Sequence, residues 1–250
     1  MIVSTGNYDT AAVVLPEATD STIESLQGIP APVAGLRFDL FGRAGKSASA
    51  IAVTPAAQGD TTTQECYSWP LAKLQSPHAN WHVGFVSGRV QPIPLDSLEA
   101  MSGADSSALA VSLAQTAATL PGASDPTFRV LPFRVRSAYH ILLDSVDVVI
   151  ADVVRSVNEE ANPRVEHLLM VGERPRGAGG KFTVGYYSRT AGKEESVQAT
   201  EILAAVRIAA SKRPVVVVNV EYDEGGKLGL IERSAAGEWR ATWRSAYTDC

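Results

Sequence analysis

The sequence has few of the residues that mark metal or redox proteins. Its two cysteines, Cys66 and Cys250, supply neither a four-ligand zinc site nor a Cys-x-x-Cys redox motif. His78 and His82 lie four residues apart, a spacing that joins two imidazoles on one metal when it falls on a helix. The residues after His82 are typical of a strand, in which residues four apart are separated by roughly 13 Å. We therefore expect no metal site.

The sequence also lacks long apolar runs and clusters of basic residues. Apolar runs such as 215–218 are far shorter than the roughly 20 residues that a membrane-spanning helix needs, so no transmembrane segment is expected. Lys and Arg number 22 against 27 Asp and Glu, and no segment is dominated by basic residues, which argues against a nucleic-acid partner. The 45% hydrophobic content is enough for the core of a globular protein.

Evidence on the cellular compartment points in two directions. The first residues show no basic segment followed by a sustained apolar one, so this sequence predicts no secretory signal, and the alternatives are a cytoplasmic location or a leader that the given sequence does not include. Cys66 and Cys250 are either two unrelated thiols or a disulfide. We favour the disulfide because a free thiol at a mobile terminus is open to oxidation, and disulfides persist outside the cytosol. The periplasm or cell envelope is therefore the predicted location.

Alternation of apolar and polar residues predicts that most of the chain is antiparallel sheet. Leu36, Phe38 and Leu40 alternate with Arg37 and Asp39, and residues 48–53 continue the pattern beyond a glycine-bearing turn, which predicts a hairpin. Three C-terminal segments separated by turns predict a three-stranded meander. The fold class is therefore α+β, mainly antiparallel.

Two helical regions are predicted within this sheet-rich chain, near 96–120 and 194–210. The first is rich in alanine and ends at Pro121-Gly122. The second has acidic residues toward its start and basic residues after its end, which complement a helix dipole. The segment 146–157 fits helical spacing, but it is so rich in Val and Ile that we predict a strand.

The predicted organisation is an arm and two lobes. Residues 1–32 read as an extended N-terminal arm, 33–120 as a β-rich lobe ending in a helical region, and 128–250 as an antiparallel-sheet lobe with one helix; the two lobes can also be one two-lobed domain. Within the second lobe, Glu173-Arg174 and the strand after it are echoed by Glu232-Arg233 and its following strand. We interpret the echo as two similar hairpins in one antiparallel sheet.

The segment LFGRAGKS, residues 40–47, is the nearest approach to a nucleotide-binding motif. A phosphate loop needs glycine five residues before Gly45, where this chain has Leu40, and it must open a helix, which Pro55 and the alternation after Ser47 disfavour. Gly42 and Gly45 are better explained as shaping a hairpin, with Lys46 solvated at its tip. With no other cofactor motif present, we expect no cofactor.

The absence of a catalytic motif favours a binding or structural role. We predict a non-catalytic, extracytoplasmic bacterial protein that acts through contacts with another protein, for example as an accessory subunit of a larger assembly. The N-terminal arm supports this because its apolar residues offer a strand to a partner; they are Ala11, Val13, Val14 and Leu15. The partner and the oligomeric state do not follow from the sequence.

Two alternatives stay open. The first is a carbohydrate or small-ligand binding protein that uses exposed aromatic side chains, with Trp69, Trp81, Trp239 and Trp243 as the candidates. Arg129, Arg134 and Arg136 would add an anion-binding edge. The second is a hydrolase of unrecognised type. Its best acid–base candidates are the carboxylates Glu159, Glu160 and Glu166 beside His167, although charged residues around a turn are more simply a solvated hairpin end.

Overall fold

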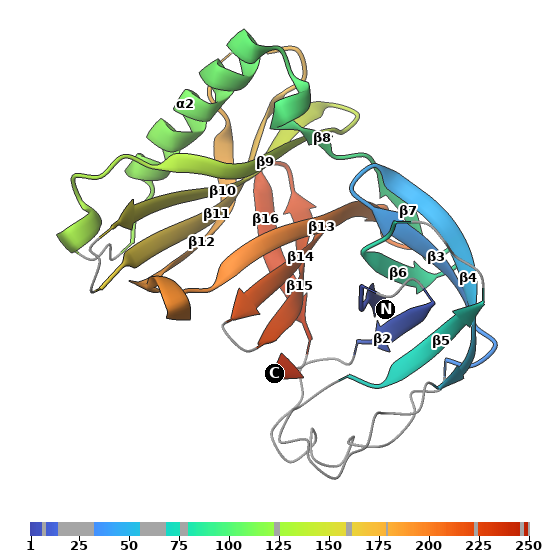
Figure 1. Cartoon of the computed structure of the whole chain (residues 1–250). Helices are drawn as coiled ribbons and strands as arrows, with labels where there is room; N and C mark the ends of the chain where they lie inside the picture. The colour runs from blue at the N-terminus through green and yellow to red at the C-terminus, as the bar shows by residue number, and fades with distance from the viewer. Residues whose placement is uncertain are drawn as a thin grey trace.

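The chain forms a small closed barrel and two antiparallel sheets (Figure 1). The computed structural model describes residues 1–6, 9–14, 33–55, 69–75, 80–122, 126–158, 162–178, 180–222, 225–245 and 248–249. The predicted class, α+β with mainly antiparallel sheet, agrees broadly with this architecture. Within these residues, none of the helices is both long and apolar enough to span a membrane.

The barrel closes in the strand order β1-β2-β5-β4-β3-β6. Its strands are β1 (Ile2–Ser4), β2 (Thr10–Val13), β3 (Arg37–Gly42), β4 (Gly45–Pro55), β5 (Leu71–Gln75) and β6 (Val83–Val86). The hairpin predicted from the alternation is present as β3 and β4. Gly45 has a φ of 116°, a conformation that favours glycine. Lys46 does not lie free at the tip, because its ammonium group pairs with Asp39 at 2.7 Å.

Two larger sheets follow, and both are antiparallel. The five-stranded sheet has the order β12-β11-β10-β9-β8, and the six-stranded sheet contains β16-β15-β14-β13-β7 with β17 paired to β15. The first consists of β8 (Asp96–Ser97), β9 (Arg134–Leu142), β10 (Val146–Val157), β11 (Arg164–Pro175) and β12 (Thr183–Lys193). The second consists of β7 (Val90–Ile93), β13 (Ala199–Ile208), β14 (Pro214–Tyr222), β15 (Gly225–Ala235), β16 (Glu238–Arg244) and β17 (Thr248–Asp249).

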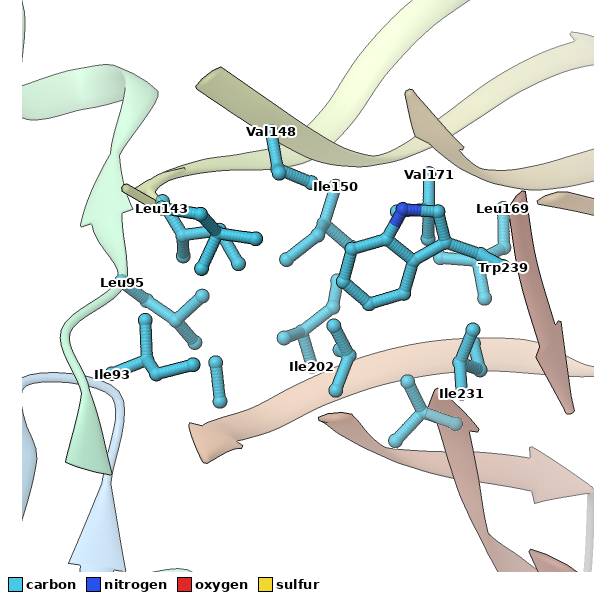
Figure 2. Close-up of a cluster of buried hydrophobic side chains, with 14 residues drawn as sticks. Ile93, Leu95, Leu143, Val148, Ile150, Leu169, Val171, Ile202, Ile231 and Trp239 are labelled. Atoms are coloured by element: carbon cyan, nitrogen blue, oxygen red, sulfur yellow. The ribbon is translucent and has the colours of Figure 1, made fainter. Parts of the chain in front are cut away.

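The two sheets pack face to face, and each has its other face covered. Figure 2 shows the cluster between them, where Ile150 and Val171 of one sheet meet Ile202 and Trp239 of the other. Helix α2 (Gly103–Thr119) covers the outer face of the five-stranded sheet, and the barrel packs on the outer face of the six-stranded sheet. Three short 3-10 helices complete the described elements: Leu98–Ala100, Pro126–Phe128 and Glu194–Ser196.

Burial on both faces explains the strands whose sequences do not alternate. In β10, Val148 and Ile150 face the second sheet, whereas Val149 and Val153 pack under α2, so nearly every position is apolar. The prediction of a strand at 146–157 is confirmed. The helix predicted at 194–210 is wrong, because 199–208 form β13. Its alanine-rich middle is buried between the sandwich core and the barrel, where small side chains fit between two layers.

The first half of the chain contributes strands to all three sheets. Residues 1–32, predicted as an arm, supply β1 and β2 of the barrel in their described part. Strands β7 and β8 pair with β13 and β9, and α2 packs on the sheet that contains β9 and β10. The helical region predicted near 96–120 and the C-terminal meander of β14, β15 and β16 are both present.

The internal echo corresponds to two hairpins that lie in different sheets. The hairpin β11–β12 belongs to the five-stranded sheet and β15–β16 to the six-stranded one, so the prediction of a single shared sheet is wrong. The two hairpins meet at Glu173. Its carboxylate accepts hydrogen bonds from Arg233 Nε at 2.6 Å and Nη2 at 2.9 Å, from the Gly237 N–H at 3.0 Å, and from Trp239 Nε1 at 2.6 Å.

This cluster, the Glu173 latch, sets the charge state of its carboxylate. Burial alone would raise the pKa of Glu173, but the hydrogen bonds from Arg233, Gly237 and Trp239 outweigh it and lower the pKa below 4.5. The hydrogen bond from Glu173 is also the main cause that raises the pKa of Arg233. The ionised carboxylate therefore stabilises the contact between the sheets at neutral pH.

We predict that Glu173→Gln lowers the free energy of unfolding at pH 7 by about 2–4 kcal/mol, since it leaves the Arg233 charge without its partner. The folded-state pKa of Glu173 is depressed, so its stabilisation is complete above pH 4.5, the ordinary pKa, and declines as the pH falls below it. The variant and the unchanged protein should therefore converge in acid. Urea unfolding from pH 3 to 7 measures this, with the exposed Glu195→Gln as a control; equal stability at pH 7 would contradict the role of the latch.

The hairpins also approach closely at Gly185. A Cβ atom at this position would lie 2.3 Å from the Gly237 carbonyl oxygen, which belongs to rigid backbone. We predict that Gly185→Ala destabilises the fold by about 1–3 kcal/mol, because the edge of β12 must move away from the β15–β16 turn. Gly103→Ala, at the first residue of α2 with open space around it, should be neutral or slightly stabilising. Thermal unfolding of both variants compares the two sites, and a neutral Gly185→Ala would exclude the close approach.

Candidate functional site

A cavity of about 120 Å³ lies between the two sheets, on the same strands as the Glu173 latch but toward their other ends. Strand β11 carries both features, with the latch at Glu173 and the cavity at His167, about 20 Å away along the strand. We call it the inter-sheet cavity. Its volume is several times the minimum that one water molecule requires. The polar, charged and aromatic residues that line it include His167, Tyr186, Ser188, Thr190, Gln198, Lys227, Trp243 and Arg244.

A charged cluster from three neighbouring strands lies at one wall of this cavity, which its member His167 lines. Asp152 of β10 is fully buried, and its carboxylate accepts a hydrogen bond from Arg136 Nη1 at 2.9 Å. Both oxygens of Asp152 also lie 3.3 Å from His167 Nδ1. The register between β9 and β10 shifts here, which leaves Arg136 at a bulge that directs it to Asp152. Arg136 Nη1 also lies 3.4 Å from the Thr200 carbonyl oxygen and so connects β9 to β13.

The contact with Asp152 determines how His167 faces the cavity. A carboxylate held by an arginine can only accept hydrogen bonds, so His167 Nδ1 must donate to it. In the neutral imidazole this tautomer leaves Nε2 as an acceptor, on the side of the ring away from Asp152. A ligand in the cavity can therefore meet either a lone pair on Nε2 or, when the ring is protonated, a second N–H donor.

The opposite wall carries aromatic and cationic side chains. A register shift between Leu230 and Ile231 places a bulge in β16 at Thr242, so that Trp239 and Trp243 do not share a face as strict alternation would require. Trp239 lies in the sandwich core, whereas Trp243 packs on the opposite face, against the cluster between this sheet and the barrel, and borders the cavity from there. Lys227 and Arg244 add positive charge at the same wall. No Asp or Glu occurs among the described residues that line the cavity.

The other tryptophans predicted as ligand contacts lie elsewhere. Trp81 is buried in the barrel core and Trp239 in the sandwich core, where both contribute to packing. Trp69 lies at the junction between the barrel and the six-stranded sheet, beside a second cavity. The inter-sheet cavity therefore brings together only one of the four predicted tryptophans, Trp243, with His167.

The residues predicted to dock on a partner lie within the barrel. Both edges of β2 are paired, with β1 and with β5, and Ala11 and Val13 belong to the barrel core. Val14 is buried between the barrel and the six-stranded sheet, and Leu15 lies outside the described residues. Cys66 and Cys250 also lie outside them, so the disulfide and the extracytoplasmic location stay predictions.

The acid–base group predicted around His167 is divided by the sheet. Glu166 is the neighbour of His167 in β11 and points to the opposite face, where Arg155 and Arg189 bind its carboxylate beneath α2. Arg189 also donates to the Leu120 carbonyl at the end of α2, so Glu166 serves to anchor the helix. Glu159 and Glu160 lie outside the described residues. Among those described, no three potential ligand side chains gather as a metal site would require.

Sequence reasoning missed Asp152 and the bulge at Arg136 as parts of the site. The available signal was the single charge in the apolar segment VVIADVV, because a buried carboxylate needs partners. Comparisons with protein-family models, with curated proteins and with solved structures found no match. The function of the protein is therefore inferred from the geometry of the inter-sheet cavity.

We predict that Asp152→Asn releases His167 from its fixed tautomer and lowers the free energy of unfolding by about 2–4 kcal/mol, because Arg136 loses its charged partner. The imidazole ¹⁵N shifts of His167 should report an Nδ1–H tautomer in the unchanged protein and a mixture in the variant. Asp96→Asn, at an exposed position on β8, is the control. Unchanged His167 shifts in Asp152→Asn would refute this role of Asp152.

Proposed function

We propose that this protein binds a small organic anion, such as a carboxylate with an aromatic or aliphatic body, in the inter-sheet cavity. The observation that carries the proposal is the position of Arg244, with His167, on a cavity whose described lining contains no carboxylate; the imidazole adds an N–H donor when it takes up a proton together with the anion. A concave site with one sign of charge concentrates ligands of the opposite charge. The charge of Asp152 lies behind His167 and is offset by Arg136.

The remaining lining fits the uncharged part of such a ligand. Tyr186 supplies aromatic surface, and aliphatic side chains from both sheets lie beside it, including Leu169 and Val218. Ser188 adds a hydroxyl group at the same wall. Mainly apolar walls with a few converging polar groups are typical of small-molecule sites. The proposal develops the small-ligand alternative rather than docking through β2, whose two edges are already paired within the chain.

A titration with matched pairs of ligands tests the charge requirement. Benzoate and hexanoate should bind, with quenching of tryptophan fluorescence, whereas benzamide and hexanamide should bind at least about 10-fold more weakly, because a hydrogen bond to a charged group contributes about 1.5–3 kcal/mol. Arg244→Met should weaken benzoate binding by a similar factor. Arg240→Met, at an exposed position on the same strand and outside the cavity lining, is the matched control. Equal affinity for the acids and the amides, or no binding of either acid, would contradict the proposal.

A further inference from the structure

A second cavity of about 240 Å³ lies where the barrel meets the six-stranded sheet, and we call it the junction cavity. Ser4 of β1, Trp69 and His82 reach it from the barrel side. Glu201 of β13 and Asn219 of β14 reach it from the sheet, together with the apolar side chains of Leu203 and Leu228. The two cavities share Leu228 of β15, but none of the polar residues named here lines the inter-sheet cavity.

Arg43 holds the two sides of the junction cavity in place. It leaves the β3–β4 hairpin of the barrel, donates from Nε to the Ile202 carbonyl oxygen at 2.9 Å, and pairs through Nη2 with the Glu201 carboxylate. Its guanidinium group also lies over the Tyr139 ring, 5.6 Å from the centroid. The walls therefore come from two parts of the fold that a charged contact fixes relative to each other.

Trp69 has a hydrogen-bond donor at this cavity that no acceptor among the described residues satisfies. Its indole Nε1 atom is buried and has no hydrogen-bond partner in the described part of the chain. Leaving a buried donor without an acceptor costs about 1–3 kcal/mol. A ligand that places an oxygen next to Nε1 would recover this loss, so the site favours an occupant that carries acceptors.

The ionisable groups of the cavity leave it without net charge. Burial lowers the pKa of His82, and the nearby Arg43 charge adds to the effect while Glu201 opposes it, so the imidazole is neutral at pH 7. The Glu201 carboxylate is neutralised by Arg43. A charged ligand would therefore gain little here to offset the loss of its hydration.

The hydrogen-bonding groups require an occupant that both donates and accepts. Trp69 only donates and the Glu201 carboxylate only accepts, whereas Ser4, neutral His82 and Asn219 can do both. Hydroxyl groups combine the two roles in one atom, and the carbon skeleton between them can lie against Leu203 and Leu228. We infer that the junction cavity binds an uncharged polyhydroxy compound, with one monosaccharide unit as the fitting class.

The test uses the full chain and four sugars: D-glucose, D-mannose, D-galactose and N-acetyl-D-glucosamine. At least one should show saturation transfer from the protein and a measurable affinity by calorimetry. Trp69→Phe, which removes the N–H donor but keeps an aromatic ring, should weaken that affinity by about 5-fold or more. Tyr187→Phe, at an exposed position on β12 outside the lining of both cavities, is the control and should leave sugar binding unchanged.

The outcomes separate this inference from the proposed function. Loss of sugar binding in Trp69→Phe with benzoate binding intact supports the junction site. If none of the four sugars binds the folded protein at 10 mM, roughly the weakest affinity of interest for a specific site, or if Trp69→Phe binds as well as the unchanged chain, the inference is overturned. A junction cavity that holds only water in the presence of the sugars would also overturn the inference. Sugar binding at the junction cavity does not depend on benzoate binding. A failure of benzoate to bind would therefore contradict only the function proposed for the inter-sheet cavity.

Discussion

The contact of Glu173 with Arg233, Gly237 and Trp239 fixes how the two large sheets face each other. The carboxylate belongs to one sheet, and all of its donors belong to the other, so the sandwich is held at this end by charge-assisted hydrogen bonds as well as by apolar packing. The strands that leave this end carry the core in their middle and the inter-sheet cavity beyond it. A site that lies between two sheets can keep its geometry only if the sheets keep their spacing. The latch therefore supports the site from a distance of about six residues along β11.

Arginine side chains also bind other buried carboxylates among the described residues, including those of Asp152 and Glu166. Asp152 is bound by Arg136 and lies beside His167, Glu166 is bound by Arg155 and Arg189, and each cluster joins three neighbouring strands of the five-stranded sheet. Burial of an unpaired charge is costly, so each carboxylate constrains the elements that bring its partners. What distinguishes the Asp152 cluster is its position, because His167 is the member that borders a cavity. Glu166 therefore has a structural role, because its partners pack against other parts of the protein, whereas Asp152 orients a side chain that faces a cavity.

Sequence patterns predicted many of the local elements, including β10, whose Val and Ile content indicates a strand although both of its faces are buried, and failed at β13. The β3–β4 hairpin follows from alternation and the C-terminal meander from its turns, whereas alanine-rich β13 resembles a helix because acidic residues lie toward its start and basic residues follow its end. The site was less accessible to such reasoning. Asp152 and His167 meet through strand pairing across 15 residues, and Arg136 joins them through a bulge that has no sequence signature here. The cluster is assembled by the pairing of three strands, so no motif or turn in the sequence indicates it.

The central claim is that the inter-sheet cavity takes a small organic anion against His167. The imidazole ¹⁵N shifts of the four histidines, followed during a titration with benzoate, test this most directly, because each ring reports its own surroundings. The account predicts that the Nε2 signal of His167 moves with the ligand concentration while the signals of His82 and His140 stay fixed. A saturable shift at His82 in place of His167, or no shift at any histidine, would contradict it.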